Sequence, residues 1–337
     1  MRFSAWLRDR PLLVIPLFLG LYGYGTIDVS DYRVLSAAPF ELHPVPARQF
    51  LQFSPLAYFL GYPLTTTVGM TWSFAIVMGG GLVCFAAALR HLAAVRYRAH
   101  QHDAMLMILA TPLLIVLTQY VGKSDLYLVA FLLLLVASAN PAMQVVFSGL
   151  IVLCHFEIGL LVLVSAMFLR IVPWRSAIVG GVAGMLLMLG YHHYLLPAPP
   201  LSRADMSVGF LSEALGAVIN TPILHLVFTF GAFWMCVLTA WPLGWRWRIV
   251  FAGTLVLACV TLDFTRVFIL VGLPMTIAVV DKVFPAADDG TGPGAPWWFV
   301  ALPLLAFVQV HLLSGYVFDS RMPGLIGRIF ASLSALN

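Results

Sequence analysis

The feature that most constrains this chain is a succession of long apolar runs separated by short polar turns. Only 9% of its residues are charged and 61% are hydrophobic, whereas a soluble domain carries about 25% charged residues. The runs are continuous, and a lipid-facing barrel would alternate apolar and polar side chains instead. The chain is therefore predicted to be an all-α, polytopic integral membrane protein.

The apolar runs predict about eleven transmembrane helices, at 11–26, 56–89, 104–120, 126–139, 142–153, 158–169, 176–196, 219–241, 249–262, 267–280 and 297–315. Several are shorter than the ~20 residues that cross hydrocarbon, so we expect them to tilt, to extend into polar residues or to end inside a cavity. The run 56–89 is long enough for one tilted span with a short helical lead-in.

The chain as a whole, 1–337, is predicted to form a single transmembrane domain. Its first outer loop, 27–54, is expected to hold an interfacial helix, and its tail, 316–337, to lie on the outer face. The glycine-rich stretches "MGGGL", 78–82, and "VGGVAGM", 179–185, are expected to allow close packing between helices.

Basic residues give the orientation. The N-terminus has a basic start like a signal peptide but no small-residue cleavage site, so we interpret it as a retained first span. With that end in the cytoplasm, eleven lysines and arginines fall inside and seven outside, as the positive-inside rule requires. We expect a bacterial inner-membrane protein. The formal charge of +4 is explained by topology, and no nucleic-acid partner is predicted.

Three short polar turns, "GKSD", "CHFE" and "LDFTR", reach the outer face in this topology. Charges at that depth are costly unless they pair or face water. We therefore expect a shared, water-filled outer cavity. The residues placed there are Lys123, Asp125, His155, Glu157, Asp263 and Arg266. For Asp263 and Arg266, spaced i, i+3, an internal ion pair is the competing interpretation.

The first outer loop opens with "DVSDYR", which places Asp28 and Asp31 on one side of a helical turn, with Arg33 beside them. A carboxylate at a helix start is also favoured by the helix dipole alone. This acidic dyad, the aromatic loop and then "SPLAYFLGYP" resemble the opening of the GT-C superfamily of membrane glycosyltransferases. "GKSDLYLVAFLLLL" is similar to an outer turn and span midway through such enzymes, so the resemblance covers roughly the first 140 residues.

The resemblance implies a GT-C-like fold and a glycosyltransferase that moves a sugar from a polyprenyl-phosphate donor to a glycan or lipid acceptor outside the membrane. It implies inverting transfer without metal or cofactor, with Asp28 or Asp31 as the catalytic base. Such transfer needs a base for the acceptor hydroxyl and cations for the leaving phosphate. The candidate phosphate ligands are Arg33, Arg48 and Arg266, with Lys123 as a helper. The other predicted substrate-binding residues are Asp125, His155, Glu157 and Asp263.

Other classes of membrane protein remain as alternatives. The late polar turns also suit a polysaccharide polymerase or ligase of the Wzy or EpsG type, acting on a lipid-linked oligosaccharide. A transporter is disfavoured, because its charges would lie near the bilayer midplane and its halves often repeat. A metallohydrolase is disfavoured because the four cysteines and nine histidines show no metal-ligand spacing, so neither zinc nor a disulfide framework is expected.

Overall fold

The computed structural model describes residues 2–23, 25, 29–119, 122–200, 203–261, 263–284, 301–307, 312–313 and 316–317. Apart from one antiparallel hairpin, β1 (Leu312–Leu313) and β2 (Tyr316–Val317), its regular structure in these residues is helical, which confirms the all-α class. The α-helices are α1 (Arg2–Arg8), α2 (Val14–Tyr22), α3 (Val29–Ala37), α4 (Leu56–Val68), α5 (Met70–Arg96), α6 (Gln101–Leu109), α7 (Leu113–Gln119), α8 (Asp125–Ala137), α9 (Pro141–Cys154), α10 (Phe156–Phe168), α11 (Trp174–Gly190), α12 (Arg203–Asn220), α13 (Pro222–Phe230), α14 (Trp234–Thr239), α15 (Trp245–Cys259), α16 (Phe264–Val283) and α17 (Leu302–Leu305).

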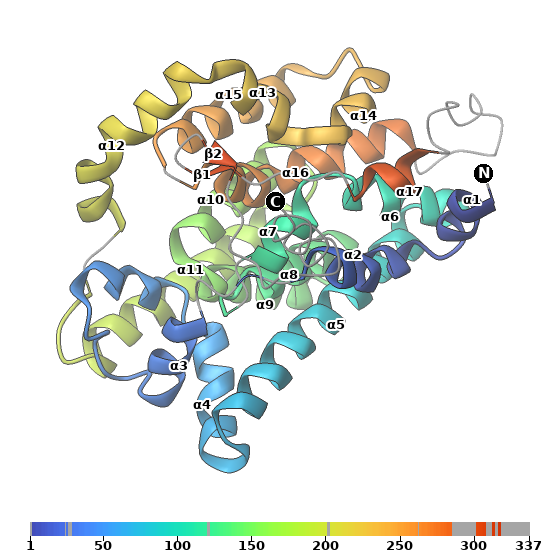
Figure 1. Ribbon diagram of the computed structural model, residues 1–337. Helices are drawn as coiled ribbons and strands as arrows, with labels where there is room; N and C mark the ends of the chain where they lie inside the picture. Colours follow the sequence, from blue (N-terminus) through green and yellow to red (C-terminus); the bar gives the residue numbers. More distant parts are fainter. Residues whose placement is uncertain are drawn as a thin grey trace, which may run out of the picture.

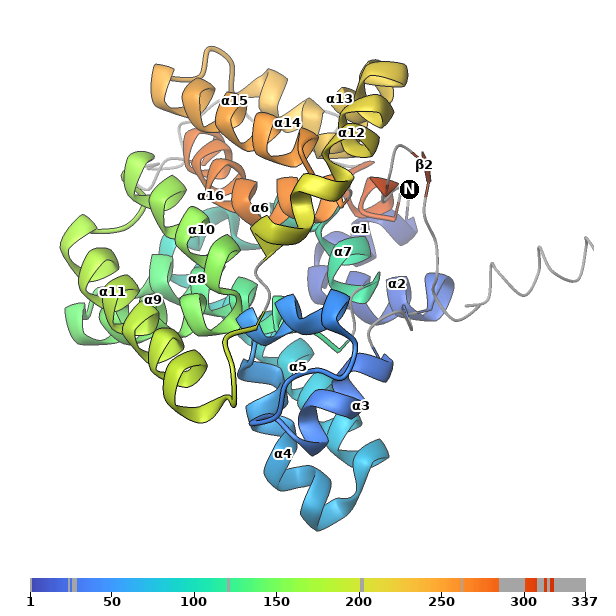
Figure 2. The ribbon, with the colours of Figure 1, turned by 90° about the vertical axis from the view of Figure 1, so that its left-hand side faces the viewer.

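The other described helices are 3-10 helices and one π-helix. The 3-10 helices are η1 (Pro11–Leu13), η2 (Pro46–Phe53), η3 (Arg98–His100) and η5 (Gly231–Phe233), and the π-helix is η4 (Tyr191–Leu195). Figure 2 shows α9, α10 and α11 on one side of the molecule, α12 to α16 above, and α3, α4 and α5 below.

Helix α16 is the centre of the fold. It packs against α6, α7, α10, α13, α14 and α15, and 89% of its most apolar window is buried. Twenty residues of α-helix extend about 30 Å, the thickness of the hydrocarbon layer. We name the two ends of the bundle by this helix: the Arg266 end, where α16 begins, and the Lys282 end, where it finishes.

Three helical segments are long and apolar enough to cross a membrane: α5, α11 with η4, and α16. The pair formed by Arg98–Leu109 and Leu113–Gln119, bent by 57°, makes a fourth if it counts as one span. Four more apolar helical segments, Pro11–Tyr22, α8, α9 and α10, have 10–17 residues. The structure therefore supports membrane integration through three or four spans, and the number eleven stays a prediction.

The run 56–89 is not the single tilted span that the sequence predicts. It divides at Gly69, whose φ of +84° suits glycine and interrupts the helix. Helices α4 and α5 meet there in a V at the bottom of Figure 1, beside α3. The Tyr127 hydroxyl of α8 donates to Val77 O at 2.6 Å, so the first two turns of α5 project beyond the start of α8.

Helices α9 and α11 approach closely because glycines face α9. A methyl group at Gly180 would lie 2.2 Å from Val145 O, and one at Gly184 would lie 2.6 Å from Gly149 O. Neither distance is possible for real atoms, so only glycine allows this contact. The expected close packing is thus confirmed for these two glycines. It fixes the end of α11, which meets the first loop at the candidate site.

Candidate functional site

A buried ion pair joins the starts of α8 and α16. Arg266 donates through Nε to Asp125 Oδ2 at 2.7 Å and through a terminal nitrogen to Asp125 Oδ1 at 2.9 Å. Asp263 Oδ2 lies 3.6 Å from the other terminal nitrogen. The Arg266 and Asp125 side chains are only 1% and 3% exposed. Two predicted site residues from distant turns are therefore brought together, as a fork-to-fork pair in a dry environment.

The turn Gly122–Asp125 places these charges. Gly122 has a φ of +116°, which reverses the chain before α8, and Asp125 then lies in the first turn of that helix, where the dipole favours a carboxylate. Lys123 is buried in the same turn. The Ser124 hydroxyl accepts a hydrogen bond from Ala57 N at 3.0 Å and donates one to Ser54 O at 3.2 Å. The end of the first loop is thus fastened to the charged turn.

The third predicted turn also lies at the Arg266 end. His155 is the extended residue between α9 and α10, and its Nδ1 accepts a hydrogen bond from Ile158 N at 3.5 Å. Glu157 follows, half-buried, in the first turn of α10, and α10 packs on α16. Phe156 contacts Phe53 of the first loop at a ring distance of 6.0 Å. All three charged turns therefore gather at one end of the bundle.

The first loop contributes a second polar group. Asp31 is 4% exposed in the first turn of α3. Its Oδ1 accepts a hydrogen bond from Arg48 and lies 3.5 Å from His43 Nε2. Burial raises the pKa of the neighbouring Tyr32 phenol, which therefore stays protonated at neutral pH and does not accept a proton. Gly25 N donates to Thr118 O at 2.6 Å, so the chain enters this loop beside the end of α7, close to the charged turns.

A buried polar network holds the loop against the end of α11, and its members were not among the predicted site residues. Gln52 is fully buried; its amide accepts from His43 N at 3.2 Å and donates to Glu41 O at 2.9 Å. It also lies 3.4 Å from the hydroxyl of Tyr191, which donates to Pro39 O at 2.6 Å. The available sequence signal was weak: a glutamine in the otherwise apolar stretch "FLQF".

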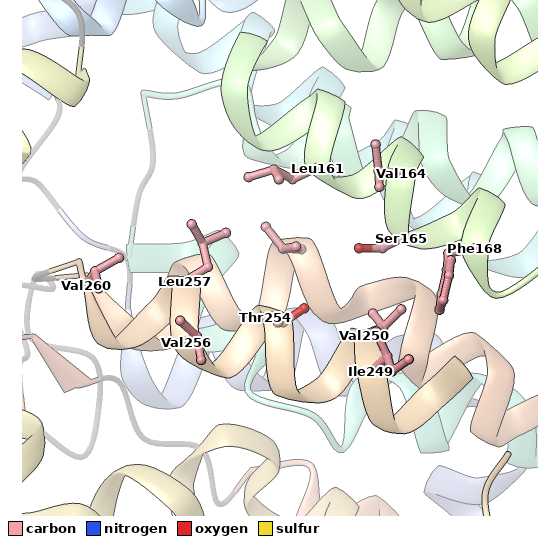
Figure 3. A pocket seen from close by; sticks show the side chains of 12 residues that line it. Leu161, Val164, Ser165, Phe168, Ile249, Val250, Thr254, Val256, Leu257 and Val260 are labelled. Atoms are coloured by element: carbon pink, nitrogen blue, oxygen red, sulfur yellow. The ribbon is translucent and has the colours of Figure 1, made fainter. Parts of the chain in front are cut away.

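An apolar groove of about 480 Å³ runs between α10, α15 and α16. Figure 3 shows Leu161, Val164 and Phe168 of α10 across from side chains of α15, with few hydroxyls among them. Its lining begins one turn beyond Glu157 in α10 and includes Val271, five residues after Arg266. The groove therefore leads away from the charged turns along the apolar flank. A second groove, of about 380 Å³, lies among Leu19, Phe74 and Leu117.

Some predicted residues are not joined to these groups. Arg33 is exposed on α3, and no ion pair of the described residues includes it. Asp28 lies outside the described residues, as does all of the tail 316–337 except β2. Within the part of the chain that the structure describes, no three histidine, cysteine, aspartate or glutamate side chains are arranged to hold a metal ion.

Comparison with protein-family models, with curated proteins and with solved structures finds nothing that matches this chain, so the site's own chemistry is the basis for its function.

Proposed function

We propose that the chain is an integral membrane glycosyltransferase that moves a sugar from a polyprenyl-phosphate donor to a glycan or lipid hydroxyl outside the membrane. One observation carries the proposal: three charged turns and the loop carrying Asp31 gather at the Arg266 end, where an apolar groove begins. A lipid-linked donor needs this combination, because its phosphate and sugar require polar partners while its isoprenoid chain requires an apolar surface.

The groove between α10 and α15 is the proposed place for the isoprenoid chain. It is open along its side, since Val164 is 56% and Val256 is 65% exposed, so a chain can enter from the lipid phase. Because the groove begins near Glu157 and Arg266, the attached phosphate is proposed to lie at the charged turns. Asp125 binds two nitrogens of Arg266, and Asp263 lies 3.6 Å from the third, so both carboxylates hold this guanidinium at the start of the groove.

Asp31 is the proposed base, and Arg48 controls access to it. The Arg48 side chain is 44% exposed while that of Asp31 is 6% exposed, so Arg48 covers the carboxylate and can turn to a phosphate. When it does, Asp31 takes the proton of the acceptor hydroxyl. The acceptor oxygen bonds to the anomeric carbon from the opposite face, the bond from that carbon to the phosphate oxygen breaks, and polyprenyl phosphate leaves. A single displacement of this kind inverts the anomeric centre.

The number of spans and their orientation in the membrane are also proposed. Eleven spans with a cytoplasmic N-terminus, in a bacterial inner membrane, place the Arg266 end outside and the Lys282 end inside. Support comes from the clustering of arginine-bearing segments at the Lys282 end, where Arg8 pairs with Asp103 and Arg96 with Asp281. The short helices α8, α9 and α10 then cross a thinned or protein-lined part of the membrane.

A polymerase or ligase acting on a lipid-linked oligosaccharide is the second candidate. It is favoured by the gathering of His155, Glu157, Asp263 and Arg266, all from later turns, around the start of α16. The two candidates differ in donor and product. A transferase adds one sugar from a lipid monophosphate, whereas a polymerase transfers an oligosaccharide from its lipid carrier to a hydroxyl of another lipid-linked oligosaccharide.

The test is transfer by the purified full chain in proteoliposomes supplied with a panel of polyprenyl-phosphate monosaccharides and a polyprenyl-diphosphate oligosaccharide. We expect release of polyprenyl phosphate and one added sugar of inverted configuration, read by mass spectrometry and nuclear magnetic resonance. A ladder of oligosaccharide products establishes the polymerase instead. Release of neither lipid from any donor, with the protein folded and a glycan and a lipid acceptor supplied, contradicts both.

A further inference from the structure

Four exposed tryptophans at the Lys282 end each carry an arginine of the same segment over the ring. The distances from the guanidinium carbon to the ring centre are 5.4 Å for Arg10 on Trp6, 5.4 Å for Arg175 on Trp174, 5.4 Å for Arg246 on Trp245 and 5.2 Å for Arg248 on Trp241. The four indoles are 42–61% exposed. We name these eight residues the tryptophan–arginine belt.

Contacts place the belt at one end of the bundle. Trp6 and Arg10 flank Arg8, which pairs with Asp103 at 2.6 Å beside the start of α6. Lys282 donates to the carbonyl of Pro242, next to Trp241. Trp245 meets Phe168, the last residue of α10, edge to face at 5.6 Å, and Trp174 begins α11 shortly after it.

The belt arginines have no acidic partner in the part of the chain that the structure describes. Among the described residues, no carboxylate lies within ion-pair distance of these four guanidinium groups, whereas Arg8 and Arg96 at the same end each have an aspartate. The arginine charges do not stabilise their own helices either. Arg175 and Arg246 lie in the first turns of α11 and α15, which hold no acidic residue, and there the helix dipole opposes a cation.

The geometry points to a binding surface for anionic phospholipid headgroups of the leaflet at the Lys282 end. Indole rings prefer the boundary between headgroups and acyl chains, and they leave the paired guanidinium at the level of the lipid phosphates. A net anionic headgroup supplies a counter-charge to these arginines, and a zwitterionic headgroup supplies no net charge. The attraction of one arginine near an anionic membrane surface, about 1 kcal/mol, corresponds to about a fivefold preference. This surface is independent of the proposed transfer reaction.

Lipid retention tests the inference. The full chain is released from nanodiscs of equimolar phosphatidylglycerol and phosphatidylcholine, and the retained lipids are counted by native mass spectrometry. We expect the wild type to retain about fivefold more phosphatidylglycerol than phosphatidylcholine. The triple variant R175Q/R246Q/R248Q is expected to retain the two nearly equally. The charge-keeping variant R175K/R246K/R248K and the opposite-end variant R33Q are expected to keep the preference.

Equal retention of the two lipids by the wild type overturns the inference, and so does an unchanged preference in the glutamine variant or an equal loss in R33Q. A second measurement needs no variant. Phosphatidylglycerol brominated on its acyl chains should quench the tryptophan fluorescence of the wild type in mixed bilayers more strongly than brominated phosphatidylcholine at the same mole fraction. Equal quenching by the two lipids contradicts the proposed surface.

Discussion

Two arginine–aspartate pairs of the same geometry lie at opposite ends of α16, and they differ in how much water reaches them. At the Arg266 end, Arg266 and Asp125 have side chains 1% and 3% exposed. At the Lys282 end, Arg96 donates to both oxygens of Asp281 at 2.7 and 2.8 Å, with side chains 27% and 29% exposed. Each pair ties a neighbouring segment to the same central helix.

The contrast between the two pairs shows where the fold accepts an energetic cost. When an ion pair is buried, the free energy lost by removing both charges from water is about as large as the free energy gained by their attraction. Apolar residues of similar volume therefore stabilise a protein as well or better. A partly solvated pair, such as Arg96 with Asp281, loses less hydration and contributes little to the free energy of unfolding. The Arg266 end therefore keeps charges that stability alone does not require, and it gathers Lys123, Asp263 and Glu157 around them. Ionisable residues retained in this way inside membrane proteins mark functional sites.

Replacing an aspartate at the Arg266 end should reduce activity far more than replacing one at the Lys282 end. Asp31→Asn removes the proposed base while keeping the shape of the side chain, and we expect sugar transfer to fall by about 10²–10⁴-fold. The readout is the initial rate of polyprenyl-phosphate release in proteoliposomes. Asp281→Asn, at the Lys282 end, is the matched control and should keep the wild-type rate within about twofold. Equal losses in the two variants would show that the carboxylate of Asp31 has no special role.

Breaking the ion pair at the Arg266 end should also lower the free energy of unfolding more than breaking the pair at the Lys282 end. Asp125→Asn removes the closer counter-charge of the buried Arg266 guanidinium and leaves only Asp263, 3.6 Å from one nitrogen, so we expect the free energy of unfolding to fall by about 3–5 kcal/mol. Denaturant titration of the purified protein in detergent measures it. The double variant Asp125→Leu with Arg266→Met should recover most of that stability but remain inactive. Recovery of both stability and activity would show that the pair is structural only.

A smaller effect concerns the network that holds the first loop to α11. Gln52→Ala leaves the Glu41 carbonyl and the His43 amide without their partner, at a cost of about 1–3 kcal/mol. We expect faster hydrogen exchange in 29–53 and a reduced transfer rate, with α16 unaffected. Exchange mass spectrometry resolves the two regions. Uniform acceleration in α16 as well would mean that Gln52 supports the whole bundle rather than the loop.

The smallest effect is expected for the solvated pair. Arg96→Gln should lower the free energy of unfolding by about 0–1 kcal/mol, and the loss should shrink further as salt screens the wild-type pair. Denaturant titrations at low and high ionic strength compare the two proteins. A loss of 3 kcal/mol or more would remove the distinction between the two ends.

Much of the arrangement could be predicted from the sequence because hydrophobic runs and polar turns are local signals. The charged turns Gly122–Asp125 and Asp263–Arg266 were predicted to meet at one end, and they do. The identity of the partners was not predictable: Arg266 pairs with Asp125, 141 residues away, more closely than with Asp263, three residues away. Partner choice over such distances depends on how helices pack, which no spacing along the chain records.

Two other features were beyond a single sequence. The break at Gly69 looks like an ordinary glycine in an apolar run, and only its positive φ shows that α4 and α5 are separate helices. The Gln52–Tyr191 contact joins residues 139 apart. A hydrophobicity profile shows Gln52 only as one polar residue of a loop, and its burial against Tyr191 and His192 of η4 appears only in the folded chain.

Photo-crosslinking tests most directly the claim that the Arg266 end receives a lipid-linked phosphate. The full chain in nanodiscs is irradiated with polyprenyl phosphate bearing a diazirine near the phosphate end of its chain, and the modified peptides are identified by mass spectrometry. We predict adducts in 157–168 of α10 and 249–259 of α15, lost when unlabelled polyprenyl phosphate is in excess. Adducts confined to the second groove, at Leu19 or Phe74, or unchanged by the competitor, would contradict the account.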